Sequence, residues 1–423
     1  MNRNKLRDFY ILWSTQSLSR LGSSMTSFAL TLWLYESTGS SLSTAALTIC
    51  SYTPYVLMSI FAGALCDRFD KKITILACDL LAAMSTVFVL LLYRSGNLAV
   101  WHLYLVNVIS GLMNTVQDPA SEVAETLLVP NECYQKTSSL KQLSRSIISI
   151  FNPLAASAIY GLFGLEAVIA FDLGTFIIAF MALLLLIDLP KIERSESENV
   201  LALAKEGLSY LKDNPMIFNL IMFMSGVNLV ASAFDAVLPG LVLPNPKGGE
   251  KVLGIVTSCS GIAMIAGSFI ASILPKPKNR VRVVYLTMLF SLGSENFLLA
   301  LSREPLVWCM GQIIGWIVVP VMSSNLEIIM RNTIPVKLQG RIYACRNTMQ
   351  FFTIPLGLFL GGFFVDEVCE PFMMKNTSVL LNILFGYGKG SGASLMMFVL
   401  GVAGALLCLI TGQMLKQYSY NEH

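Results

Sequence analysis

The chain alternates between long apolar runs and short polar segments. Each run holds about 20 residues, the length that an α-helix needs to cross about 30 Å of hydrocarbon. A soluble fold has no place for so many helices that are apolar on every face, so the pattern predicts an all-α membrane protein. The twelve predicted membrane-spanning helices cover residues 9–36, 43–65, 73–93, 99–118, 141–160, 165–187, 217–242, 252–274, 283–301, 306–330, 343–366 and 393–416.

Composition agrees with this pattern. Only 13% of the 423 residues are charged and 55% are hydrophobic, whereas a soluble domain carries about 25% charged residues. Most of the 29 lysines and arginines lie before the first span, after the last span, or in loops that follow even-numbered spans. The positive-inside rule places this side in the cytoplasm. We therefore expect a multi-pass protein of the plasma (inner) membrane with both termini cytoplasmic.

Sequence patterns for catalysis and metal binding are absent. The two histidines, His102 and His423, belong to no H-E-x-x-H motif, and no G-x-S-x-G or G-x-x-x-x-G-K-[ST] motif occurs. Nine scattered cysteines suggest neither a metal site nor a disulfide framework. We expect a protein that is not an enzyme and has no cofactor and no metal. Any active transport would then draw on an ion gradient or a partner.

The longest polar connection divides the spans into six and six. The predicted organisation is an N-terminal half at 1–188, a cytoplasmic linker at 189–215 and a C-terminal half at 216–423. Apolar residues recur at helical spacing within the linker, which predicts a short helix on the cytoplasmic leaflet. Two six-helix halves around a central site are typical of secondary transporters.

A charged stretch, GALCDRFDKK at residues 63–72, follows the second span. It resembles the loop 2–3 signature of the major facilitator superfamily, G-x-x-x-D-R-x-[GD]-[RK]-[RK]. The segments FYILWSTQSLSRLGSSM, ETLLVPNECYQKTSSLKQ, AKEGLSYLKDNP and IPVKLQGRIYACRNTM resemble the drug:proton antiporter branch that includes macrolide efflux proteins. The resemblance implies the major facilitator fold, with two pseudo-symmetric six-helix halves. It implies a gating role for the motif residues Gly63, Asp67, Arg68, Asp70, Lys71 and Lys72.

The chemistry of this stretch is compatible with a latch. Gly63 allows a neighbouring helix to approach closely, and Asp67 is expected to accept hydrogen bonds at a helix N-terminus. The basic residues are expected to face the anionic leaflet or to pair with acids. In the family, this loop closes the cytoplasmic side against the eleventh span. The alternative is a topology anchor that only obeys the positive-inside rule.

Two segments depart from the family pattern. The corresponding loop of the second half, ILPKPKNRVR, has no Asp-Arg pair. In span 5, Asn152-Pro153 is followed by Ala156-Ser157, where antiporters of the family often carry Gly-Gly. The first departure implies an asymmetric latch, and the second leaves the direction of transport open.

Arg20 is the most unusual residue of the first span. It lies about 16 Å into the span, where a charged side chain is costly and marks a candidate site. A polar stripe accompanies it at helical spacing, so we expect this face to line a water-filled substrate cavity. The alternative is a structural arginine that is buried between helices and paired with an acid or with backbone carbonyls. The candidate cavity residues are Gln16, Arg20, Ser24 and Ser27, with Ser23 on the same face.

Four acids inside or near the ends of spans are candidates for proton coupling. In the family, spans 1, 4, 7 and 10 surround the cavity, which favours Asp118, Asp235 and Glu327. Glu295 matches Arg20 in depth but belongs to a span that is usually peripheral. The alternative for these acids is a salt bridge at a gate or a side chain that reaches the interface. Asp79 is expected to support the neighbouring loop.

Together these features predict proton-coupled export of amphipathic, drug-like compounds by alternating access. The expected partners are a small amphipathic substrate, protons and the lipid bilayer, with no nucleic acid, and the protein is expected to act as a monomer. Export of an endogenous metabolite, lipid or siderophore is the alternative among transporters. A non-transporting membrane receptor and an intramembrane enzyme are the alternatives from other classes.

Overall fold

A computed structural model describes residues 3–68, 70–129, 134–189, 209–334 and 336–415. Every regular element in these ranges is helical, as the hydropathy pattern predicts. Eight helical segments of the described chain are long and apolar enough to cross a membrane. One of them, Ser146–Leu186, holds two predicted spans, so the eight segments account for nine. The other three predicted spans correspond to the helices Arg3–Thr38, Ser41–Arg68 and Val100–Leu128, and the structure therefore fits twelve crossings.

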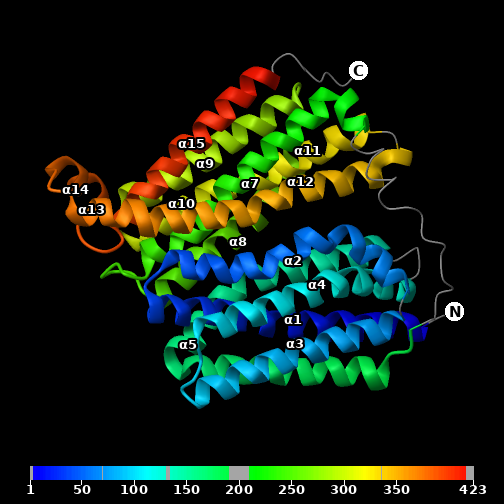
Figure 1. The fold of residues 1–423 in the computed structure, drawn as a ribbon. Coiled ribbons are helices and arrows are strands. Elements are labelled where there is room, and N and C mark those ends of the chain that lie inside the picture. The colour runs from blue at the N-terminus through cyan, green and yellow to red at the C-terminus, as the bar shows by residue number, and fades with distance from the viewer. Residues whose placement is uncertain (1–2, 69, 130–133, 190–208, 335, 416–423) are drawn as a thin grey trace. The chain divides into compact units, whose positions relative to one another are not determined.

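The contacts between Cα atoms divide the chain into two units. The first unit comprises residues 1–37 and 47–198. It contains α1 (Arg3–Thr38), α2 (Ser41–Arg68), α3 (Lys71–Arg94), α4 (Val100–Leu128) and α5 (Tyr134–Leu186) (Figure 1). The predicted spans 141–160 and 165–187 both lie within α5, which turns at Gly164 with a φ of 78°. Glycine tolerates this left-handed conformation because it has no Cβ.

The second unit comprises residues 38–46 and 199–423. Its membrane helices are α7 (Pro215–Val242), α8 (Glu250–Ile273), α9 (Arg280–Leu301), α10 (Pro305–Trp316), α11 (Val319–Thr333), α12 (Val336–Phe363) and α15 (Ser391–Leu415) (Figure 1). The predicted linker lies mostly outside the described residues, although 209–213 are helical. The first turn of α2 belongs to this unit, where the Asp366 carboxylate accepts hydrogen bonds from Ser40 Oγ (2.6 Å) and the Leu42 amide (2.8 Å).

The long outer connection between α12 and α15 is also helical. It forms a π-helical turn (η2, Phe364–Cys369) and two short helices, α13 (Glu370–Lys375) and α14 (Val379–Phe385). The Glu370 carboxylate accepts a hydrogen bond from the Gly392 amide (2.5 Å) at the start of α15. Arg303 donates to the carbonyl of Phe385. Burial lowers the pKa of the Arg303 guanidinium, and the negative charge of Glu370 partly offsets this effect.

Glycines allow close packing between helices of the second unit. A Cβ on Gly361 of α12 would lie 2.5 Å from the carbonyl oxygen of Ala233 on α7. A Cβ on Gly357, one turn earlier, would overlap the hydroxyl of Ser232. Because lipid chains are as apolar as the side chains, such close backbone contact is a main source of helix association in membranes.

Candidate functional site

A stripe of exposed polar side chains follows α1 in the first unit. Arg20, Ser23 and Ser27 are exposed at spacings of three and four residues, and Ser24 beside them is partly buried. Side chains at this spacing share one face of a helix. Polar side chains within a membrane-spanning helix are rarely placed against lipid, so this face suits a water-filled path.

Gln16 lies on the buried side of α1 and contributes to a polar cluster. Its Nε2 donates to Asp79 Oδ2 of α3 at 3.1 Å, and Gln117 Nε2 of α4 donates to Asp79 Oδ1 at 2.6 Å. The Asp79 side chain is buried. The expectation that Asp79 supports the neighbouring loop is wrong, because its carboxylate instead joins three membrane helices. Gln16 was predicted as a site residue, whereas Asp79 and Gln117 were missed.

Arg20 pairs with an acid from α4. Its guanidinium Nη2 lies 3.4 Å from Asp118 Oδ1, and the two side chains are 44% and 59% exposed. Arg20 also lies within electrostatic range of Asp79. Gln16 and Arg20 therefore lie near the buried carboxylate of Asp79, and Asp118 joins them through its pair with Arg20. Arg20 is accessible, so its surroundings do not match those of an arginine buried between helices.

A second buried acid lies against α1. Asp172 of α5 accepts a hydrogen bond from Ser23 Oγ at 3.0 Å. The helices approach closely here, because a Cβ on Gly22 would lie only 2.9 Å from the Cα of Asp172. Asp172 was not among the predicted site residues. The sequence did carry a signal for it, because an acidic residue inside an apolar span is costly and marks a candidate functional site.

The charged stretch after α2 fixes two helix ends. Asp70 is the N-cap of α3, and its Oδ1 accepts hydrogen bonds from the amides of Lys72 (2.9 Å) and Ile73 (3.2 Å). Lys72 Nζ donates to the carbonyls of Leu184 (3.1 Å) and Ile187 (2.7 Å) at the end of α5. A cation there satisfies free carbonyls and complements the helix dipole.

The described partners of the Lys72 ammonium are therefore carbonyl groups and not an acid, and its position against the leaflet remains a prediction. Lys71 of the same stretch is buried. The side chains of Asp67 and Arg68, and the surroundings of Gly63, lie outside the described residues, so their predicted roles remain predictions.

The remaining predicted acids lie in the second unit. Asp235 on α7 and Glu327 on α11 are exposed, and Ser323 lies one turn before Glu327 on the same face. Glu295 on α9 is buried and accepts a hydrogen bond from the Trp316 indole Nε1 at 2.9 Å. The three acids therefore differ in how far neighbouring side chains cover them, which the sequence did not indicate.

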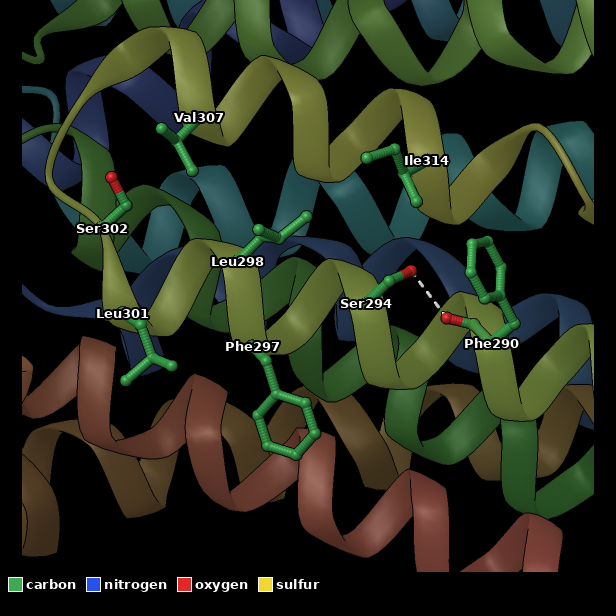
Figure 2. Close-up of a pocket in the computed structure, with 8 residues that line it drawn as sticks. All are labelled: Phe290, Ser294, Phe297, Leu298, Leu301, Ser302, Val307 and Ile314. Atoms are coloured by element: carbon green, nitrogen blue, oxygen red, sulfur yellow. Dashed lines mark hydrogen bonds between the residues drawn. The ribbon is translucent and has the colours of Figure 1, made fainter.

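An apolar groove of about 600 Å³ lies between α9 and α10. Figure 2 shows Phe297, Leu301 and Phe290 along it, with Ser294 donating a hydrogen bond back to the Phe290 carbonyl. No charged side chain lines this groove, so it is suited to hydrocarbon and offers no polar chemistry. No cluster of metal-ligating side chains occurs among the described residues.

Residues 12–358 match the family model described as Major Facilitator Superfamily. Macrolide efflux protein A of Streptococcus pyogenes is 24% identical over 386 residues, which cover 90% of this chain and 95% of that protein. The multidrug efflux pump Tap of Mycolicibacterium fortuitum is 23% identical over 359 residues, covering 82% and 86% respectively.

Solved transporter structures share the fold. A bacterial homologue of the iron transporter ferroportin, in an inward-facing state, superposes with a TM-score of 0.74 at 14% identity, covering 96% of this chain and 98% of that one. A bacterial homologue of the lysosomal transporter Spinster gives a TM-score of 0.74 at 11% identity over all of both chains. At these identities the likeness establishes the fold alone.

Proposed function

Because the chain belongs to the major facilitator superfamily, we propose that this transporter exports amphipathic, drug-like compounds of the macrolide or multidrug type in exchange for protons. Family membership and the apolar helices make it a multi-pass membrane transporter of small molecules. The efflux relatives support the substrate class and the direction of transport. We propose that the transporter lies in the plasma membrane and works as a monomer.

The observation that carries the proposal is the exposed polar stripe of α1 with the pair Arg20–Asp118. An exposed ion pair adds little stability, about 0–1 kcal/mol. A charged pair kept accessible within a membrane helix is therefore better explained by contact with a polar group of a substrate than by folding. The apolar part of such a substrate would meet the apolar residues that make up most of each span.

The test is pH-gradient-driven transport into inverted membrane vesicles, with a panel of compounds that includes macrolides. Arg20→Ala should weaken substrate binding, because a hydrogen bond to a charged group contributes about 1.5–3 kcal/mol, which is roughly a 10- to 100-fold change. Arg20→Lys should restore only part of the transport, since a point charge does not reproduce the planar five-donor fork. The amount of protein in the membrane should stay near the wild-type level.

Arg94 provides a matched control. It pairs with Glu166 at 2.9 Å in the same unit, and the two side chains are 62% and 43% exposed. Arg94→Ala removes a similar exposed pair away from the polar stripe, so transport should persist. Equal loss of transport in both alanine variants, or transport unaffected by Arg20→Ala, would contradict the proposed site.

A further inference from the structure

Glu295 is buried deep in the second unit. It lies on α9 with a side chain that is 5% exposed, seven residues before Ser302 ends that helix. Burial removes this carboxyl group from water. For the ionised form, the loss of hydration costs several kcal/mol unless the charge is paired. Among the described residues, its hydrogen-bond donor is the indole N–H of Trp316, at 2.9 Å.

The helices around Glu295 offer it little positive charge. The elements that pack on α9 are α7, α10, α11, α14 and α15, and the sequences of α10, α14 and α15 contain no charged residue. The charged residues on the others are Asp235 on α7, which interacts unfavourably with Glu295, and Glu327 and Arg331 on α11. The remaining titratable groups on these elements are Tyr285, Cys309 and Cys408.

Within the described side chains, no cation forms an ion pair with Glu295. The basic residues of α9 itself, Arg280 and Arg282, lie at its first turn, four turns away along the helix. Arg280 Nη1 donates to Asn325 Oδ1 of α11 at 2.9 Å. The surroundings of Glu295 are therefore better suited to a neutral carboxylic acid than to a permanent ion.

The backbone of span 10 is shaped around this carboxyl group. Gly315 has no side chain, and a Cβ there would lie 2.7 Å from Glu295 Oε2. The span kinks directly afterwards: α10 ends at Trp316, Ile317 and Val318 keep right-handed helical backbone angles, and α11 begins at Val319. Proline is a common cause of such kinks, and Pro320 follows here. The kink lies next to the residue whose indole contacts Glu295.

The two buried acids of the first unit are placed differently. Asp79 accepts hydrogen bonds from two amides and lies near Arg20, so its charge is compensated. Asp172 accepts from the Ser23 hydroxyl, and Ser23 is exposed to the polar path along α1. Among these three buried acids of the described chain, Glu295 is the one with a single neutral donor, and that donor lies next to a kink of span 10.

We propose that Glu295 is the group that carries the transported proton. Water on one side of the membrane delivers the proton to the carboxylate, which becomes a neutral acid. The acid later releases the proton to water on the other side and becomes a carboxylate again. The Trp316 indole N–H stabilises this deprotonated form by donating a hydrogen bond to it. No other bond forms or breaks. The assignment rests on the proposed function, since it names the coupling site of a proton-driven exporter.

The test uses the purified transporter in lipid vesicles with a radiolabelled macrolide. Glu295→Gln keeps the shape and an acceptor for Trp316 but cannot bind a proton. With an imposed pH gradient, accumulation should fall to the level of protein-free vesicles. Exchange of labelled for unlabelled macrolide without a gradient should continue. Glu304→Gln is the matched control and should accumulate normally, since Glu304 lies outside α9 and α10 and pairs with Lys247.

Infrared difference spectra between acidic and alkaline buffer test the site without any substrate. Many of the 26 acidic residues titrate between these buffers, so the spectrum of Glu295→Gln is subtracted from that of the wild type. The result should contain one carbonyl band of a protonated carboxylic acid, which belongs to Glu295. Trp316→Phe keeps the acid and should move the pH midpoint of this band, which is informative even where Glu295→Gln fails to fold. If the band behaves in this way but no macrolide is accumulated, the proton site stands and the proposed substrate is wrong.

Three results would overturn the assignment. The first is gradient-driven accumulation by Glu295→Gln at the wild-type level. The second is the absence of a carboxylic acid band from the difference between wild type and Glu295→Gln, or a midpoint of that band that is unmoved by Trp316→Phe. The third is loss of coupling in Asp235→Asn or Glu327→Gln together with normal coupling in Glu295→Gln.

Discussion

At the scale of single residues, Asp70 shows how one side chain sets a helix boundary. Its carboxylate accepts two amide hydrogen bonds at the start of α3. Asp70→Ala removes this cap and should lower the free energy of unfolding by about 0.5–2 kcal/mol. Thermal unfolding in detergent measures the change. Asp70→Asn keeps a good N-cap and should cost much less, so equal destabilisation by both variants would contradict the capping role.

At the scale of helices, close packing between α7 and α12 depends on Gly361. The Cβ of Gly361→Ala would lie 2.8 Å from the Cα of Ala233 and even nearer to its carbonyl oxygen, so the helices must separate. Overpacking of this kind costs roughly 1–3 kcal/mol. Gly361→Ala should therefore lower the melting temperature in detergent.

Gly293 on α9 is the control for this substitution. No heavy atom lies within 4 Å of a Cβ built there. Gly293→Ala should be neutral, or stabilising by up to about 1 kcal/mol, because alanine favours the helix more than glycine does. A similar loss of stability in both variants would show that the close approach of α7 and α12 is not the cause.

The kink between α10 and α11 also belongs to the scale of helices. The hydropathy pattern predicted one span at 306–330, and the two helices together cover residues 305–333. Pro320 has no N–H, so the hydrogen bond to the carbonyl of Trp316 cannot form. The kink follows from one residue, but the contact of Trp316 with Glu295 required the neighbouring helix to be in place.

At the scale of the whole molecule, the distribution of lysine and arginine predicts the orientation in the membrane. A reporter that is active only in the cytoplasm should give a signal when fused after His423 and no signal when fused after Lys247. The reason is the excess of basic residues in the loops on the side of both termini. Reporter activity in both assays, or the reverse pattern, would contradict this topology.

Much of the architecture followed from the sequence alone. A membrane helix must be about 20 apolar residues long and must satisfy its own backbone, so hydropathy located the spans. The helices can extend beyond them: α4 continues to Leu128, past the predicted end at 118, and α12 begins at Val336, before the predicted start at 343. The predicted 73–93 corresponds to α3 at Lys71–Arg94, and 252–274 to α8 at Glu250–Ile273. The motif GALCDRFDKK indicated the family, which the match over residues 12–358 confirms.

Only the tertiary structure decided which polar side chains meet. Gln16 and Asp79 are 63 residues apart in the chain, and Lys72 contacts a carbonyl 115 residues away. Hydropathy reports the depth of a residue in a span, but not the helix that its side chain faces. For this reason the sequence identified Arg20 and Glu295 as costly residues, whereas the packed helices left Arg20 accessible and enclosed Glu295 beside Trp316.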